Sequence, residues 1–385
     1  MKFWNFLIFI SIVLLVYGSV NYYIFLRGLQ AIPKEIIFRN YYIIFFILIA
    51  LTFWAGRILE NFMLNWFTET LVWIGSFWLA FMLYFFLFAV IFDLLRLLNH
   101  FFGIFPAFIT ENYVKAKWIS LLSIIGVVIA IVIYGHINFL NPRIHKFEIT
   151  IPKKDSRLSS LNIAVASDLH LGTIVGKRRL DDFIEKVNSL NADIVLLPGD
   201  IFDEDLGPII KDNLGDSLKL LKSKYGVYAV TGNHEFIGGV NAAVDYMEDH
   251  GVTVIRDTAI LIDSAFYLVG REDLSIDRFT DNYRKELSEI IRTVNKDLPV
   301  ILLDHQPHNL QIARENGIDL QLSGHTHHGQ LCPLNYITSM IYEISWGYKK
   351  IGNTHYYVSS GFAGWGPPVR TGSRTEVVNI IVNFE

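Results

Sequence analysis

The chain has 385 residues, a formal net charge of −4 and 52% hydrophobic residues, with a mean hydropathy of +0.36. That length allows two domains, and that hydropathy is too high for an ordinary soluble protein. The single cysteine, Cys332, excludes an internal disulfide framework. The basic cluster from Lys177 to Arg179 is short and followed at once by acidic residues, so no nucleic-acid partner is indicated.

Four long apolar runs fill the first 140 residues: Phe3 to Leu26, Tyr41 to Trp54, Leu71 to Phe92 and Trp118 to Leu140. A bilayer core of about 30 Å needs roughly 20 apolar residues in a helix. We therefore predict a transmembrane region over 1–140, with spans at about 3–26, 37–58, 71–95 and 118–140. This makes the chain a multi-pass protein of the cell membrane.

The sequence argues against two alternatives to this anchoring role. A cleaved signal peptide would need a shorter first run and small residues before a cleavage site, whereas the run ends in NYYIFLRG. A transporter would need several polar residues along a pathway, and Asp93 with Arg96 is too few. Basic residues near the span ends divide almost evenly between the two sides, so the positive-inside rule predicts no orientation.

After Pro142 the pattern changes to short apolar runs that alternate with amphipathic stretches. This alternation predicts an α/β domain over 161–385, which a linker over 141–160 joins to the membrane region. Each predicted strand ends in polar residues, where α/β proteins usually bind ligands. The five stretches are LNIAVASDLHLG, ADIVLLPGDIFDED, GVYAVTGNHEF, LPVILLDHQP and DLQLSGHTHHGQ, which begin at Leu161, Ala192, Gly226, Leu298 and Asp319.

The polar residues at these strand ends are carboxylates, imidazoles and an amide, with no thiolate. Such a set suits Mn²⁺, Fe or Zn²⁺ better than a structural zinc site, which prefers cysteine. Each of these polar motifs taken alone has an explanation without a metal; an isolated H-x-H, for example, is more often an exposed polar turn than a metal site. Five such motifs at the ends of five strands favour a metal centre.

The ordered series SDLHLG, LLPGD, TGNHE, LLDHQP and SGHTHHGQ resembles the calcineurin-like metallophosphoesterase superfamily from Leu161 to the C-terminus. The most similar branch is the small bacterial one with GHTHGGQ, in which the first glycine of GG is replaced here by His328. The resemblance implies a four-layer αββα sandwich that holds two divalent metal ions. It assigns Asp168, His170 and His327 to the first metal, Asn233, His305 and His325 to the second, and Asp200 to both.

The resemblance also implies roles in catalysis and substrate binding. His234 would lie beside the metals and protonate the leaving oxygen, and Asp203 matches the position that orients this histidine. Arg370, in GPPVRTG, is a candidate substrate contact, with a solvated loop arginine as the alternative. His328 is either idle, a substrate contact or an extra ligand.

These observations predict a membrane-anchored phosphohydrolase, including phosphodiesterase activity, in which a metal-bridging hydroxide attacks a phosphoester or pyrophosphate bond in line. A substrate linked to a lipid would explain four spans where one would be enough to anchor the domain. The alternative is a catalytically silent membrane sensor or scaffold that keeps the metal fold. That alternative predicts the loss of a ligand or of His234, and the sequence retains them all.

Overall fold

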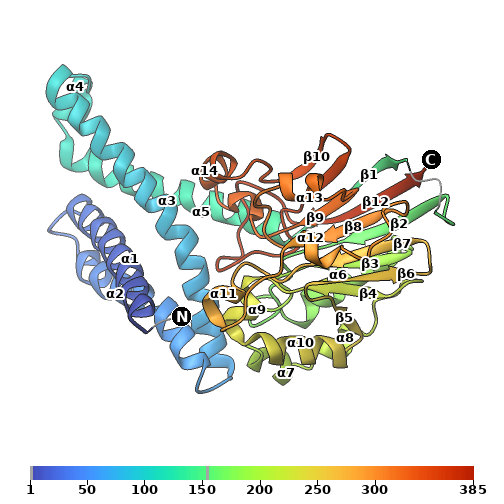
Figure 1. Cartoon of the computed structure of the whole chain (residues 1–385). Coiled ribbons are helices and arrows are strands. Elements are labelled where there is room, and N and C mark those ends of the chain that lie inside the picture. The colour runs from blue at the N-terminus through green and yellow to red at the C-terminus, as the bar shows by residue number, and fades with distance from the viewer. Residues whose placement is uncertain (1–2, 153–155) are drawn as a thin grey trace. The chain divides into compact units, whose positions relative to one another are not determined.

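The computed structural model describes residues 3–152 and 156–385 (Figure 1). The chain forms two compact units, which meet in the sequence between His136 and Ile137. The first unit is helical and the second contains all of the described strands. Each unit is described by itself below.

The first unit contains the four apolar helices that the sequence predicts, and one short helical turn. They are α1 (Phe3–Ala31), α2 (Phe38–Glu60), α3 (Trp66–Phe102), the turn α4 (Ala107–Thr110) and α5 (Tyr113–Leu140). The four long helices are long and apolar enough to cross a membrane. The predicted spans overlap these helices, but the helix bounds differ from the predicted ones, most of all for α3, which begins at Trp66 and ends at Phe102.

Helix α3 illustrates how the local sequence sets these ends. The Asn65 side chain accepts hydrogen bonds from the backbone N–H groups of Phe67 and Thr68, and the Thr68 hydroxyl accepts one from the Asn65 N–H. This capping box satisfies N–H groups that have no partner within the helix. Gly103 ends the helix in the left-handed conformation, with φ 61°, which a glycine adopts without steric cost.

The second unit is built on two six-stranded sheets (Figure 1). In spatial order, the first sheet contains β1 (Arg143–Ile151), β12 (Glu376–Phe384), β2 (Ser160–Val165), β3 (Ile194–Pro198), β4 (Val227–Val230) and β5 (Val252–Val254). The second contains β10 (Gly347–Ile351), β11 (Thr354–Val358), β9 (Leu320–Ser323), β8 (Val300–Leu303), β7 (Phe266–Gly270) and β6 (Thr258–Ile262).

The main hydrophobic core lies between the two sheets. Ile163 on β2 and Leu196 on β3 pack in the same cluster as Leu268 on β7 and Leu322 on β9. A second cluster, which includes Leu287, joins helical residues to the opposite face of the second sheet. Apolar residues on both faces of the sheets require a covering layer on each side. The predicted αββα sandwich is therefore confirmed.

The helices of the second unit connect these strands. They are α6 (Lys177–Ser189), α7 (Gly207–Lys211), α8 (Leu214–Leu218), α9 (Asn233–Gly238), α10 (Val240–Asp249), α11 (Ile276–Phe279), α12 (Leu287–Ile290), α13 (Gln311–Glu315) and α14 (Leu334–Ile341). A 3-10 turn, η1 (His327–Gly329), lies within the histidine-rich segment.

The structure differs from the predicted linker over 141–160. Strand β1 lies within that stretch and pairs in parallel with β12, from Arg143 opposite Glu376 to Ile151 opposite Phe384. Its sequence, RIHKFEITI, alternates apolar and polar side chains, which is the pattern of a half-buried strand. The second unit therefore begins before Leu161. Residues 153–155 of the predicted linker lie outside the described residues.

Candidate metal centre

Neighbouring strands of each sheet bring the predicted ligands together. In the first sheet β2, β3 and β4 are parallel neighbours, and in the second sheet β8 and β9 are parallel neighbours. The carboxyl ends of parallel neighbours lie at the same edge of a sheet. The loops that follow these five strands carry all seven predicted metal ligands, so residues about 160 positions apart in the sequence meet at this edge.

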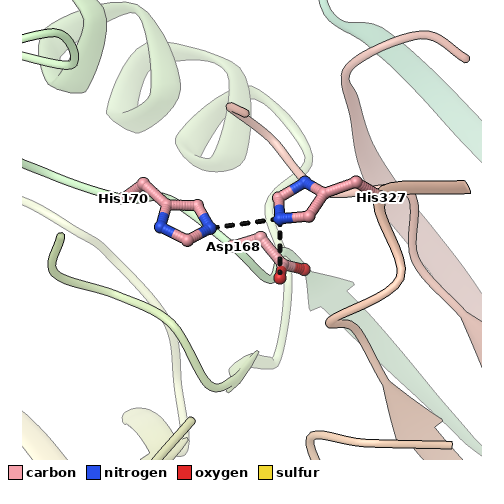
Figure 2. Close-up of side chains that lie close together, drawn as sticks. All are labelled: Asp168, His170 and His327. Atoms are coloured by element: carbon pink, nitrogen blue, oxygen red, sulfur yellow. Dashed lines mark hydrogen bonds and ion pairs between the residues drawn. The ribbon is translucent and has the colours of Figure 1, made fainter. Parts of the chain in front are cut away.

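The first group of ligands contains Asp168, His170 and His327 (Figure 2). His170 Nε2 lies 3.2 Å from His327 Nε2, and His327 Nε2 lies 3.5 Å from Asp168 Oδ1. Asp168 is fully buried and accepts hydrogen bonds from the Ser167 hydroxyl and the His325 backbone N–H. Three potential ligand atoms therefore converge on one point.

The second group contains Asp200, His305 and His325, with Asn233 between the two histidines. Asn233 Oδ1 lies 2.8 Å from His325 Nδ1 and 3.3 Å from His305 Nε2. His305 Nδ1 lies 2.7 Å from the Pro198 carbonyl oxygen, which can only accept a hydrogen bond. Nδ1 must therefore carry the proton, which leaves Nε2 as the ligand atom, as is usual for a histidine held from behind.

The Asp200 carboxylate lies between the two groups. Its Oδ2 is 3.1 Å from His305 Nε2 in the second group and 3.9 Å from His170 Nε2 in the first. Burial alone would raise the pKa of Asp200, but the neighbouring charges of His305 and His234 outweigh burial and hold that pKa well below its usual range. One carboxylate oxygen thus lies within reach of both ligand groups.

The backbone of these loops adopts an unusual conformation at the ligands themselves. Five of the seven predicted ligands have a positive φ, between 45° and 70°: Asp168, His170, Asp200, His325 and His327. A left-handed conformation costs a residue with a side chain roughly 1–2 kcal/mol. Strain of this kind collects at binding and catalytic sites, where the surrounding structure enforces it.

Glycine is needed where the loops approach the ligands most closely. Gly199 has φ 85°, and a Cβ atom there would lie 2.5 Å from His305 Nδ1. The Glu235 carboxylate holds the same loop by accepting hydrogen bonds from the backbone N–H groups of Asp200, Ile201, Phe202 and Gly232. These contacts give Glu235 a structural role.

His234 and Asp203 lie beside the first group. His234 Nδ1 is 3.3 Å from Asp203 Oδ1, and the same oxygen lies 3.8 Å from His170 Nδ1. Burial alone would lower the pKa of His234, but the charge of Asp200 and the hydrogen bond and charge of Asp203 outweigh burial and raise it to about 9. The structure thus brings these two predicted catalytic residues together.

Arg370 is fully buried against His327. Its guanidinium donates to the His327 carbonyl oxygen at 2.9 Å and lies 3.0 Å from His327 Nδ1. It also donates to the carbonyl oxygen of Ala363 and to the hydroxyl of Ser373. The predicted substrate contact of Arg370 stays a prediction, and the contacts observed are those of a residue that fixes a ligand.

Comparison with known proteins now identifies the family. Residues 161–329 match the family described as calcineurin-like phosphoesterase. An uncharacterized metallophosphoesterase of Campylobacter jejuni is 31% identical over 380 residues, which cover 97% of each chain. The chain belongs to the calcineurin-like phosphoesterase family.

Two further relatives of this phosphoesterase differ in how much of their own length is matched. An Aquifex aeolicus metallophosphoesterase is 31% identical over 255 residues, which cover 65% of this chain and 95% of the relative. A zebrafish (Danio rerio) transmembrane protein with metallophosphoesterase domain is 30% identical over 274 residues, which cover 68% of this chain and 62% of the relative. Members of the family are metal-dependent phosphoesterases, which confirms the prediction of an enzyme.

The phosphoesterase residues present fit divalent cations. Ligand atoms bound at about 2.1 Å, at right angles around one cation, lie about 3 Å apart. The contacts within the two groups are 2.8–3.5 Å. Burial together with the charge of the neighbouring His305 lowers the pKa of His325 to about 3, so its imidazole is neutral, as a ligand must be.

His328 lies apart from both ligand groups of the phosphoesterase. Its Nδ1 is 3.0 Å from the Ser345 hydroxyl, and its ring centroid is 5.8 Å from that of Trp346. Burial lowers its pKa, with a smaller effect from the charge of Arg370. Of the three roles left open by the sequence, the structure gives no support to an extra ligand.

Sequence reasoning missed a sixth polar strand end. Strand β7 is followed by Arg271, Glu272 and Asp273, and Asp273 is buried and accepts hydrogen bonds from Gln306 Nε2 at 2.9 and 3.0 Å. Gln306 follows the predicted ligand His305 directly. Arg271, Glu272 and Asp273 follow the same pattern as the other five strand ends, because polar side chains come directly after a buried strand. The five motifs of the resemblance do not include this strand end, so the sequence alone did not single it out.

Proposed function

We propose that the chain is a membrane-anchored phosphohydrolase that cleaves a phosphoester or pyrophosphate bond at a centre of two divalent cations. The observation that carries this proposal is the position of Asp200 Oδ2, 3.1 Å from one ligand group and 3.9 Å from the other. A shared carboxylate is the ligand expected between two cations about 3.5–4 Å apart.

Two bound cations would supply Lewis-acid stabilisation of the phosphoryl oxygens and a water of lowered pKa for in-line displacement. Asp168, His170 and His327 would hold the first cation, Asn233, His305 and His325 the second, and Asp200 would hold both. Mn²⁺ suits this mixture of carboxylate, amide and imidazole ligands best, with Fe and Zn²⁺ as alternatives. Two aspartates against two divalent cations leave the centre net positive, which favours a phosphate anion over a neutral ester.

We assign the transfer of a proton to His234. Its Nδ1 faces Asp203, which leaves Nε2 to give a proton to the leaving oxygen. Asp203 would hold the ring in place and favour its protonated form, since a nearby carboxylate stabilises an imidazolium. The backbone N–H of His234 donates to Asp200 Oδ1 at 2.9 Å, which fixes the residue relative to the shared ligand.

We further propose that the chain crosses the cell membrane four times and that its substrate is linked to a lipid. The four apolar helices support this proposal, because one helix would be enough to anchor a domain that acts on soluble molecules. Helix α5 ends at Leu140 and strand β1 begins at Arg143, so little chain separates the last apolar helix from the phosphoesterase domain. A site so tethered meets substrates at the membrane surface.

The test uses the purified full chain, a soluble aryl phosphodiester and added Mn²⁺. Wild type is expected to turn over the substrate with Mn²⁺ and to bind close to two metal ions per chain by elemental analysis. Asp200→Asn is expected to lower both turnover and metal content, whereas Asp212→Asn, which changes an exposed acid, is expected to alter neither. Bound metal without turnover in wild type would favour the silent scaffold, and no bound metal with no turnover would exclude both.

A further inference from the structure

Helix α14 exposes the apolar side chains of one face. None of its eight residues, all of which are described, is buried, and Tyr336, Met340 and Ile341 are 66%, 79% and 65% exposed. A helix this short is marginal in water unless tertiary packing stabilises it. The apolar face of an amphipathic helix is normally buried against protein or in a membrane interface. Among the described residues, none covers this face of α14.

Two tryptophans extend this apolar area. Trp346 and Trp365 are about half exposed. The hydroxyl of Ser345, next to Trp346, lies 3.2 Å from the hydroxyl of Ser339 in α14. The backbone N–H of Trp365 donates to the side-chain oxygen of Gln330, which precedes α14. We call this area the α14 surface; it consists of Tyr336, Ile337, Met340, Ile341, Trp346 and Trp365. Tryptophan and tyrosine beside exposed aliphatic residues are typical of the boundary between a bilayer and water.

The α14 surface adjoins the metal centre. Helix α14 begins seven residues after the predicted ligand His327, and Gly329 of that loop packs so closely on Asn335 that a Cβ atom would lie 2.5 Å from the Asn335 nitrogen. Tyr342, the residue after α14, has its ring 6.2 Å from that of the predicted ligand His325. The chain thus leaves the ligand loop, forms α14 and returns to the ligands.

The same part of the second unit contains the end of the last apolar helix. Asn138, in the final turn of α5, donates to the Arg370 carbonyl oxygen at 3.1 Å and accepts from Arg374 at 2.8 Å. Thr371, next to Arg370, accepts from the backbone N–H of Cys332 at 3.0 Å, just before α14. One loop therefore binds both the residues leading into α14 and the turn in which the chain leaves α5.

We propose that the α14 surface inserts into the lipid bilayer that anchors the chain, and that it presents the phosphate group of a membrane lipid to the metal centre. The part concerning the lipid phosphate rests on the proposed function, whereas insertion does not. The bilayer is favoured as occupant because one loop links the residues before α14 to the last turn of the apolar helix α5. The α14 surface also includes aromatic residues suited to the headgroup layer.

Insertion is tested with a spin label on the full chain. In a Cys332→Ser background, which leaves no native cysteine, a label at Met340→Cys is compared with one at Leu220→Cys, an apolar position 57% exposed elsewhere in the domain. In vesicles of phosphatidylethanolamine and phosphatidylglycerol, the Met340 label is expected to be accessible to oxygen and protected from a water-soluble nickel chelate. The Leu220 label is expected to show the reverse.

Two results would overturn the insertion. The chelate would reach the Met340 label as readily as the Leu220 label if the surface faced water. Spin–spin broadening between labels on two chains, together with protection from the chelate, would show instead that a second copy covers the surface. Neither measurement depends on turnover, so both remain informative if the proposed function fails.

Presentation of a lipid is tested with two substrates. The double variant Ile337→Glu, Met340→Glu is assayed on a nitrophenyl-headgroup phospholipid in phosphatidylcholine vesicles and on a soluble aryl phosphodiester. We expect kcat/KM for the vesicle substrate to fall by about tenfold or more, because charged side chains insert poorly into a bilayer. Turnover of the soluble ester should not change, and Leu220→Glu should affect neither substrate.

The outcomes separate this inference from the proposed function. An equal loss with both substrates would show that α14 is only structural, and no loss with either would show that lipid access does not require it; each overturns the presentation of a lipid. Wild-type turnover of the soluble ester with none of the vesicle lipid would also overturn it. If wild type cleaves neither substrate, the proposed function fails, and the spin-label result alone decides the insertion.

Discussion

The helical unit and the phosphoesterase domain differ in where their polar side chains find partners. In the helical unit the Asp93 carboxylate pairs with two guanidinium groups, those of Arg27 at 2.6 Å and Arg96 at 3.3 Å. In the domain Asp168 and Asp200 are buried among imidazoles. A buried carboxylate is costly unless it is paired or coordinates a metal.

This difference indicates that the domain, rather than the helical unit, depends on bound ions for its charge balance. In the helical unit the Asp93 ion pairs are internal. The domain gathers the predicted ligand atoms closely, with a left-handed backbone at five of the predicted ligands, which is the arrangement expected of a domain that binds cations. This asymmetry between the two units can be tested with variants and by metal removal.

Removal of His234 should abolish most of the chemistry and leave the metal centre intact. His234→Ala loses the side chain but keeps the backbone N–H that donates to Asp200. Positioned acid–base groups contribute about 10²- to 10⁴-fold, so kcat should fall within that range. Metal content, measured by elemental analysis, should remain at the wild-type level. His250→Ala, a partly buried histidine outside the centre, is the matched control.

Removal of the metals should destabilise the domain alone. A ligand that binds only the folded state, at 100 times its dissociation constant, contributes about 2.7 kcal/mol per site. With a chelator, peptides from β2, β3, β8 and β9 should therefore lose protection against hydrogen exchange, while those from α1 to α3 should not change. Equal loss in both units would contradict the asymmetry. Burial alone would lower the pKa of His305, but the charge and hydrogen bond of Asp200 outweigh burial and hold that pKa well above its usual range. Metal binding should therefore release a proton and tighten as pH rises.

Replacement of Arg370 should weaken the metal centre from behind the ligands. Lysine keeps the positive charge but cannot reproduce the fork that contacts both the His327 ring and the carbonyl oxygens of His327 and Ala363. Residues that orient a ligand typically contribute 10- to 100-fold to metal affinity. Arg370→Lys should raise the apparent dissociation constant of Mn²⁺ by about that factor, while Arg178→Lys, at an exposed position, should not. A changed KM with unchanged metal affinity would favour the substrate contact predicted from the sequence.

The grouping of the predicted strand-end ligands in space could be predicted because it follows from topology. Parallel strands place their carboxyl ends at one edge, so Asp168, Asp200 and His305 could be grouped without knowledge of any side-chain position. The contacts of Arg370 could not be predicted, since a lone arginine in a Gly/Pro loop gives no sign of which buried group it meets. The exposure of the apolar face of α14 could not be predicted either, because a short amphipathic helix usually packs that face against the core.

The boundary between the two regions was harder to predict than either region. An apolar run ends clearly at Leu140, and the first motif begins at Leu161, so the residues between resemble a linker. Strand β1 lies there because the alternation in RIHKFEITI matches an open edge of the first sheet beside β12. That edge is completed by the last strand of the chain, which is a long-range pairing that local sequence does not reveal.

The role of Asp203 should appear in the pH profile. Asp203→Asn removes the carboxylate beside His234 Nδ1, while an amide can still contact the ring. Because Asp203 helps to raise the His234 pKa, its loss should lower that pKa, and the protonated form should disappear at lower pH. The basic limb of kcat against pH should therefore move to lower pH, with a loss at neutral pH of about tenfold, smaller than that of His234→Ala. An unshifted limb would assign Asp203 to His170 instead.

The smallest expected effect concerns Asn138, whose helix begins in one region and ends in the other. Its side chain is buried and makes two hydrogen bonds, to the Arg370 carbonyl oxygen and from Arg374. Asn138→Ala should lower the free energy of unfolding of the domain by about 1–2 kcal/mol, near 1 kcal/mol for each hydrogen bond. Asn141→Ala, whose exposed side chain bonds only within the turn of α5, should cost much less. If the two variants proved equally stable in chemical denaturation, the last turn of α5 would only connect the helix to the domain and would not contribute to the stability of the domain.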